Sequence, residues 1–70
     1  MQMVPVRSRV LVAVGYSPLA HELRVQFRGW RIYAYQGVPE RIYEELLAAP
    51  SKGRYYNRVI RGHYVAVRLS

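Results

Sequence analysis

The hydrophobic repeat of this chain changes its period at Gly37-Val38-Pro39, and this change constrains the fold more than any other feature. Before it, apolar residues recur at every second position, as in β-strands. After it, they recur with the 3.6-residue period of an α-helix. Pro39 is well placed as the first helical residue, and Glu40 follows where the helix dipole favours an acid. The pattern predicts an α+β fold in which strands come first and helices follow.

Three strands are predicted ahead of this change. Residues 9–16 carry apolar side chains on both sides of the period-2 pattern, which indicates a strand covered on both faces. Residues 22–28 alternate more cleanly, with apolar side chains on one face and polar ones on the other, as in a half-buried antiparallel strand. Residues 31–36 are rich in β-branched and aromatic side chains, and the short connection before them predicts a hairpin.

Two helices and a final strand are predicted after the change. Residues 39–49 form an amphipathic helix whose apolar arc contains Ile42, Tyr43, Leu46, Leu47 and Ala49. Residues 51–61 form a second one, with a serine as its N-cap and a glycine just beyond its end. Residues 64–69 alternate again, as in a short last strand. We therefore expect a single domain over residues 1–70: a small antiparallel sheet of three or four strands with two short helices packed on one face, in the order β-β-β-α-α-β.

The composition argues against catalysis. The chain has 70 residues, no cysteine, no aspartate and four glutamates, of which three fall within six positions. Disulfide frameworks, cysteine zinc sites and thiol nucleophiles are excluded, and metal-assisted chemistry has few carboxylates to use. His21 and His63 have no second ligand at a metal-binding spacing. We predict no catalytic residues, no metal site and no cofactor.

No targeting segment is evident in the sequence. The apolar run from Val10 to Val14 is too short for the core of a signal peptide, and no stretch is long and apolar enough to span a membrane. The expectation is a cytoplasmic protein without a membrane partner.

Charge is the strongest functional signal. The formal net charge is +7, although residues 39–50 carry a local −2, so the cations concentrate elsewhere. On the second predicted helix, Arg54, Arg58 and Arg61 fall at i, i+4 and i+7 and would form one stripe that matches phosphates along a backbone. Lys52 adds a cation where that helix begins. The alternatives are a solvated face, or a seam with the acidic helix or with a second copy.

The number of loop residues in the hairpin decides where Tyr33 and Tyr35 point, because side chains alternate along a strand. With an even number, both tyrosines share the open face with the polar side chains of the preceding strand, Arg24, Gln26 and Arg28. With an odd number, both enter the core; in that register Phe27 pairs with Tyr33 and Val25 with Tyr35. Aromatic residues next to an apolar hairpin are more often buried, but the sequence leaves both arrangements open.

Several short motifs stand in a distinctive order between about Ser8 and Tyr64. They are Val14-Gly15-Tyr16, Leu23-x-Val25-x-Phe27, Tyr33-x-Tyr35, Val38-Pro39 and Ala49-Pro50-Ser51-Lys52-Gly53-Arg54-Tyr55-Tyr56-Asn57. In this order the chain resembles the KTSC domain, a short domain found at the C-terminus of some lysyl-tRNA synthetases and as a stand-alone bacterial protein. The resemblance brings no catalytic residues, and it suggests RNA binding only through the family's association with a tRNA synthetase.

Together these features predict a non-enzymatic nucleic-acid-binding module, with RNA preferred to DNA. The predicted contacts are Lys52, Arg54, Arg58 and Arg61 on the second helix, and Arg24, Arg28, Arg31, Tyr33 and Tyr35 around the hairpin. The alternative is a protein-interaction or accessory module, such as a homodimer, in which the last strand or an open sheet edge pairs with a partner.

Overall fold

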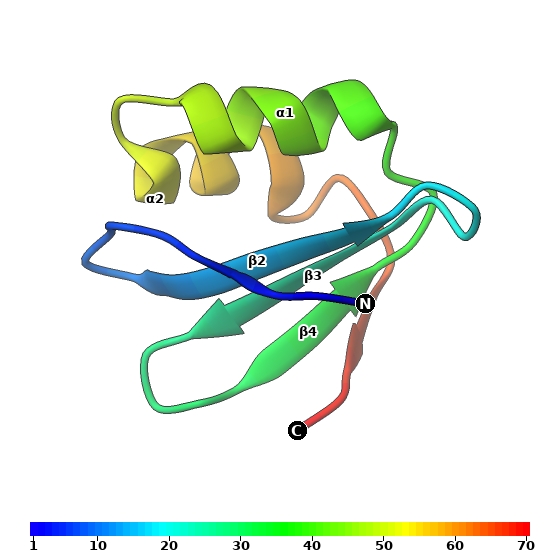
Figure 1. The fold of residues 1–70 in the computed structure, drawn as a ribbon, viewed down its shortest axis with the longest axis horizontal. Helices are drawn as coiled ribbons and strands as arrows, with labels where there is room; N and C mark the ends of the chain where they lie inside the picture. Colours follow the sequence, from blue (N-terminus) through cyan, green and yellow to red (C-terminus); the bar gives the residue numbers. More distant parts are fainter.

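A computed structural model describes residues 1–70 and places all strands in one antiparallel sheet, with the helices on one of its faces (Figure 1). The elements in chain order are β1 (Val4–Pro5), β2 (Leu11–Ser17), β3 (Glu22–Phe27), β4 (Ile32–Tyr35), α1 (Glu40–Ala48), α2 (Lys52–Tyr55), η1 (Tyr56–Ile60) and β5 (Ala66–Arg68). The sheet order is β1-β2-β3-β4-β5. The predicted α+β class is confirmed, and the short first strand, which has no periodic pattern of its own, raises the number of strands to five.

The β3-β4 hairpin closes with an odd number of loop residues. Phe27 N–H donates to the carbonyl of Arg31 at 2.8 Å, and the turn passes through Gly29 and Trp30, which both have positive φ. Leu23 lies opposite Tyr35, two residues away from the expected pairing of Val25 with that tyrosine. The prediction of an odd number of loop residues is therefore confirmed, but its strand register is wrong by two residues. The alternative with both tyrosines on the open face is wrong.

A bulge breaks the alternation of β2. The pairing with β3 shifts between Leu11 and Ala13, so Leu11 joins Val14 on the helix-covered face and is fully buried. Val10, which a strict alternation places with Val14, is 44% exposed instead. The expectation that this strand is covered on both faces is confirmed, because Ala13 and Gly15 are buried on the opposite face.

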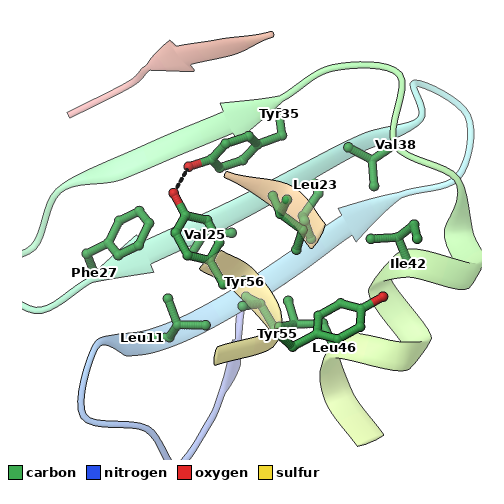
Figure 2. Close-up of a cluster of buried hydrophobic side chains, with 12 residues drawn as sticks. Leu11, Leu23, Val25, Phe27, Tyr35, Val38, Ile42, Leu46, Tyr55 and Tyr56 are labelled. Atoms are coloured by element: carbon green, nitrogen blue, oxygen red, sulfur yellow. Dashed lines mark hydrogen bonds between the residues drawn. The ribbon is translucent and has the colours of Figure 1, made fainter. Parts of the chain in front are cut away.

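The helices pack on the sheet through a shared apolar core (Figure 2). Ile42 and Leu46 anchor α1, in agreement with the predicted apolar arc of that helix, while Tyr55 and Tyr56 anchor the second helical segment. The full cluster contains Leu11, Val14, Leu23, Val25, Phe27, Tyr35, Val38, Ile42, Leu46, Tyr55, Tyr56 and Ile60. The second helix is not a regular α-helix, since its second half is a π-helical turn.

The two edges of the sheet differ. Residues Met1 to Met3 lie against Gly15, where a Cβ atom would stand 2.8 Å from the Met3 sulfur and 2.9 Å from the Gln2 carbonyl oxygen. Glycine at this position therefore allows the N-terminal segment to approach β2 closely. At the other edge, β5 pairs with β4 and leaves Val67 and Leu69 about half exposed. No helix of the structure has the length and apolar character needed to cross a bilayer.

Candidate nucleic-acid interface

Four cations from two distant segments face one hollow, which we call the basic cleft. Arg7 and Arg9 come from the loop before β2, and Lys52 and Arg54 come from α2, which lies over that loop (Figure 1). The basic cleft has a volume of about 380 Å³ and is otherwise lined by Ser8, Val10, Pro50, Ser51, Gly53 and Asn57. No glutamate lines it, so the four positive charges act on the same space without compensation.

The loop that carries Arg7 and Arg9 is fixed by hydrogen bonds. The N–H groups of Val10 and Leu11 both donate to Ser8 Oγ at 3.1 Å. Arg28 reaches the same loop from β3's end, with Nε donating to the Arg9 carbonyl at 2.8 Å and Nη2 to the Ser8 carbonyl at 3.0 Å. These hydrogen bonds fix the backbone conformation of the loop and therefore the positions of the Cα atoms of Arg7 and Arg9.

The helical side of the basic cleft is fixed in the same way. Ser51 Oγ accepts the N–H of Arg54 at 3.4 Å, as predicted for an N-cap, and Lys52 Nζ donates to the Ala49 carbonyl at 3.1 Å. Gly53 faces the opposing loop, where an added Cβ would lie 3.6 Å from Val10 Cγ2. The loop and α2 therefore pack against each other directly, and the four cations are brought together by this contact.

A second hollow, which we call the aromatic groove, lies between the hairpin, η1 and β5. Its volume is about 510 Å³. It is lined by Val10, Phe27, Arg31, Tyr33, Tyr35, Tyr56, Asn57, Arg61, Gly62, Tyr64 and Ala66. Five aromatic rings and two arginines thus share one groove, and no acid lines it.

The π-helical turn of η1 forms one wall of the aromatic groove. Arg61 N–H donates to the Tyr56 carbonyl at 2.9 Å, the five-residue spacing of a π-helix. The wider turn places Tyr56 and Asn57 on the groove and ends the helix at Arg61, whose backbone is extended. Such turns are less regular than α-helix and are frequent at functional sites.

The two hollows are neighbours, because Val10 and Asn57 line both of them. Trp30, at the tip of the hairpin, is 69% exposed. The molecule thus presents four cations in one hollow and aromatic rings with two more arginines in the hollow next to it.

The structure separates the predicted contact residues into four groups. Lys52 and Arg54 line the basic cleft; Arg31, Arg61, Tyr33 and Tyr35 line the aromatic groove; Arg58 lines a neighbouring hollow with Arg54 and Glu45; Arg24 and Arg28 belong to neither depression. Arg24 Nε instead pairs with Glu22 Oε2 at 2.5 Å, and this bond holds the pKa of that carboxyl below its usual range.

Two expectations about these residues need correction. The helical arginines do not form one stripe, because the π-helical turn and the end of the helix direct Arg61 to a different hollow from Arg58. Tyr35 is only 4% exposed, and its ring belongs to the core, so it forms the floor of the aromatic groove and offers no open stacking face. The roles of the remaining residues in binding stay predictions.

Several lining residues were not singled out from the sequence. Arg7 and Arg9 precede the first long strand in a stretch without periodicity, and only the packing of the loop against α2 brings them to Lys52. Tyr56 falls within the helix predicted over residues 51–61 and Tyr64 within the strand predicted over residues 64–69, and neither position indicates a binding site. The spacing of arginines within one segment can be seen in a sequence, whereas convergence between segments depends on the tertiary fold.

Figure 2 shows the hydroxyl groups of Tyr35 and Tyr56 pointing toward each other, joined by a hydrogen bond, with Phe27 beside them. Burial, followed by this hydrogen bond, raises the pKa of Tyr35 above its usual value. We expect Tyr35→Phe to destabilise the protein by about 1–2 kcal/mol, because the Tyr56 hydroxyl loses its partner. The double variant with Tyr56→Phe should cost less than the sum of the single variants, which urea unfolding of all four proteins measures. Additive losses would contradict this coupling.

Tyr55 makes the stability depend on pH at the alkaline end. Its hydroxyl donates to Glu45 Oε1 at 2.6 Å, and burial together with this carboxylate raises the pKa of Tyr55 from 10.0 to about 12. The unfolded chain therefore loses this proton first, so stability falls as pH rises from 10 to 12, by at most about 3 kcal/mol. We expect Tyr55→Phe to show a smaller fall than the parent in unfolding measurements at pH 9 and pH 12. An equal fall in both proteins would exclude Tyr55 as the source.

No group of three His, Asp, Glu or Cys side chains comes together to hold a metal ion. His21 and His63 both lie exposed at the surface, His21 with a positive φ.

Comparison with known proteins adds the family context. The KTSC domain matches residues 7–64 of the chain. A protein of Tsukamurella paurometabola is 39% identical over 67 residues, which cover 96% of this chain and 100% of that protein. A lysine–tRNA ligase of Nostoc sp. is 40% identical over 58 residues, which cover 83% of this chain but 10% of the ligase. The crystal structure of a KTSC domain protein from Yersinia pestis superposes with a TM-score of 0.96 at 38% identity, covering 99% of this chain and 97% of that one.

Proposed function

We propose that this chain, which belongs to the KTSC domain family, binds nucleic acid along the basic cleft and the aromatic groove, without catalysing a reaction. The observation that carries the proposal is the convergence of Arg7, Arg9, Lys52 and Arg54 on one hollow that no acid lines. Four cations with no acid among the lining residues suit a row of phosphates, and the release of counterions from those phosphates would supply most of the affinity.

The form of the depression supports a flexible strand as the ligand. The basic cleft lies next to a groove lined by aromatic rings, with Val10 and Asn57 shared between them, and this combination of cations with stacking surfaces is typical of proteins that bind single strands. RNA is preferred to DNA in the proposal because relatives of this chain lie within lysine–tRNA ligases of Nostoc species, where the matching segment covers about a tenth of the ligase.

The position of binding can be tested by NMR. Addition of a single-stranded RNA oligonucleotide should shift the backbone amide signals of Ser8, Gly53 and Asn57, which lie along the basic cleft. The signals of Arg24 and Gln26, which alternate along β3 with the core residues Leu23, Val25 and Phe27 and so lie on the opposite sheet face, should stay in place and serve as the internal control. Shifts confined to the control residues, or none at low salt, would contradict the proposal.

A second candidate function is interaction with a protein, such as another copy of the chain. The observation that favours it is the apolar character of the last strand, where Val65, Val67 and Leu69 are exposed at the edge of the sheet. In this case Val67→Lys should lower the mass measured in solution by light scattering and leave RNA binding intact. A monomeric mass for the parent protein would remove the homodimer from consideration.

A further inference from the structure

We infer that the aromatic groove receives one unpaired nucleotide of the bound strand and thereby makes this domain selective for single-stranded over double-stranded RNA. The inference rests on the proposed function and deepens it, because it assigns separate tasks to the two hollows. The basic cleft would contact phosphates of any strand, and the aromatic groove would discriminate between an unpaired base and a paired one.

Size and lining fit a single nucleotide. A volume of about 510 Å³ lies within the range of pockets that enclose small molecules. Phe27, Tyr35 and Tyr56 are each less than one-tenth exposed and form the floor, whereas Tyr33 and Tyr64 are half-buried and still have ring surface to offer. Bases of any sequence stack on such rings because every base has a flat π face.

The polar groups around the groove suit the rest of a nucleotide. Arg31 and Arg61 bring positive charge to its rim without a neighbouring acid, so they can face the phosphates that flank the base. Asn57 contributes an amide, which both donates and accepts hydrogen bonds and can therefore meet the edge of a base. Asn57 lines the basic cleft as well as the groove, so a strand that crosses this residue would contact both hollows.

A base-paired nucleotide cannot use this groove. Its base is stacked between neighbours and hydrogen-bonded to its partner, so entry between η1 and the hairpin would require unpairing. The basic cleft has no such requirement, since phosphates are accessible on the outside of a duplex. Selectivity for single strands should therefore depend on Tyr33 and Tyr64 and not on the cations of the cleft.

The test compares two variants with one control on two ligands of the same sequence, a single-stranded RNA and its duplex. Tyr64→Leu and, independently, Tyr33→Leu should lower the affinity for the single strand about ten-fold and change the affinity for the duplex less than two-fold. The control K52Q/R54Q should lower both affinities. Because Tyr64 follows the helix in a loop, its variant should fold even if Tyr33→Leu perturbs the hairpin, and circular dichroism checks both.

The outcomes separate the two proposals. If the tyrosine variants weaken both ligands equally, or neither, the inference is overturned while the proposed function stands. If the parent protein binds neither ligand at low salt, the proposed function itself fails. Titration with adenosine monophosphate identifies the source of the nucleotide: binding in the millimolar range is expected for a strand-binding groove, whereas binding tighter than that of the single strand would assign the groove to a free nucleotide and overturn the inference.

Discussion

The variant K52Q/R54Q is expected to bind single-stranded RNA about 25-fold more weakly than the parent at 0.1 M monovalent salt. Each lost phosphate contact changes the slope of log K against log salt by about 0.7 for a single strand, so two contacts change it by about 1.4. Over the one decade of salt between 1 M and 0.1 M, this slope change corresponds to an affinity loss of about 25-fold. The variant R7Q/R9Q should give a similar loss, since its cations face the same basic cleft from the opposite loop. With all four positions changed, the affinity should fall about 600-fold.

A matched control tests whether position or total charge matters. The variant R41Q/R68Q removes the same two charges from α1 and β5, outside both hollows. It should retain most of the parent's affinity and nearly the same salt slope. Fluorescence anisotropy with a labelled oligonucleotide measures both quantities. Equal losses in the control and in K52Q/R54Q would mean that the charge acts as a diffuse field, and the basic cleft would no longer be a site.

Leu46→Ala is expected to destabilise the protein by about 3 kcal/mol, because Leu46 is fully buried and anchors α1 on the sheet. A 70-residue domain has a stability of roughly 4–10 kcal/mol, so the loss would be a large fraction of the total. The neighbouring Leu47 is only partly buried and provides the control. Leu47→Ala should cost about 1 kcal/mol or less. Urea unfolding checks both values, and equal costs would contradict the packing described for this helix.

The same two leucines show how far periodicity predicts burial. The sequence places both in the apolar arc of α1, and the structure confirms the arc but distinguishes its centre, Ile42 and Leu46, from its flank. A helical wheel predicts the direction in which each side chain of α1 points, whereas the extent to which that side chain is buried depends on the part of the sheet that it meets. The order of the elements from β2 to β5 was also predictable, because each of them has a clear period and a glycine or proline near its boundary.

Two features of the sheet could not be predicted from the alternation of apolar and polar residues along the strands. The bulge between Leu11 and Ala13 inserts a residue where every nearby side chain is apolar, so the pattern shows no change of phase. The strand β1 has only two residues and depends on pairing with β2 for its existence. For the hairpin, the number of loop residues could be odd or even, and the usual burial of aromatic residues favoured the odd number that the structure has. The register within that choice depends on the turn through Gly29 and Trp30.

For the candidate site, the sequence predicted the types of residue involved better than their positions in the fold. Positive charge, tyrosines and the start of α2 were all singled out, and Lys52 and Arg54 do face one hollow. Arg7 and Arg9 lie more than forty positions earlier in the chain, so their convergence with Lys52 depends on the packing of Val10 against Gly53. The arginine stripe failed because a π-helical turn has a different period from the α-helix on which the stripe was drawn.

Binding of single-stranded RNA phosphates by the four cations of the basic cleft is the proposal on which the others rest. It is tested most directly by measuring the affinity of the parent protein for such an RNA between about 0.02 and 0.3 M monovalent salt. We expect binding that weakens along a straight line of log K against log salt, with a slope of about −3 from the four contacts of the basic cleft and a steeper one if Arg31 and Arg61 also bind phosphate. Absence of binding at the lowest salt, or an affinity that does not change with salt, would contradict it.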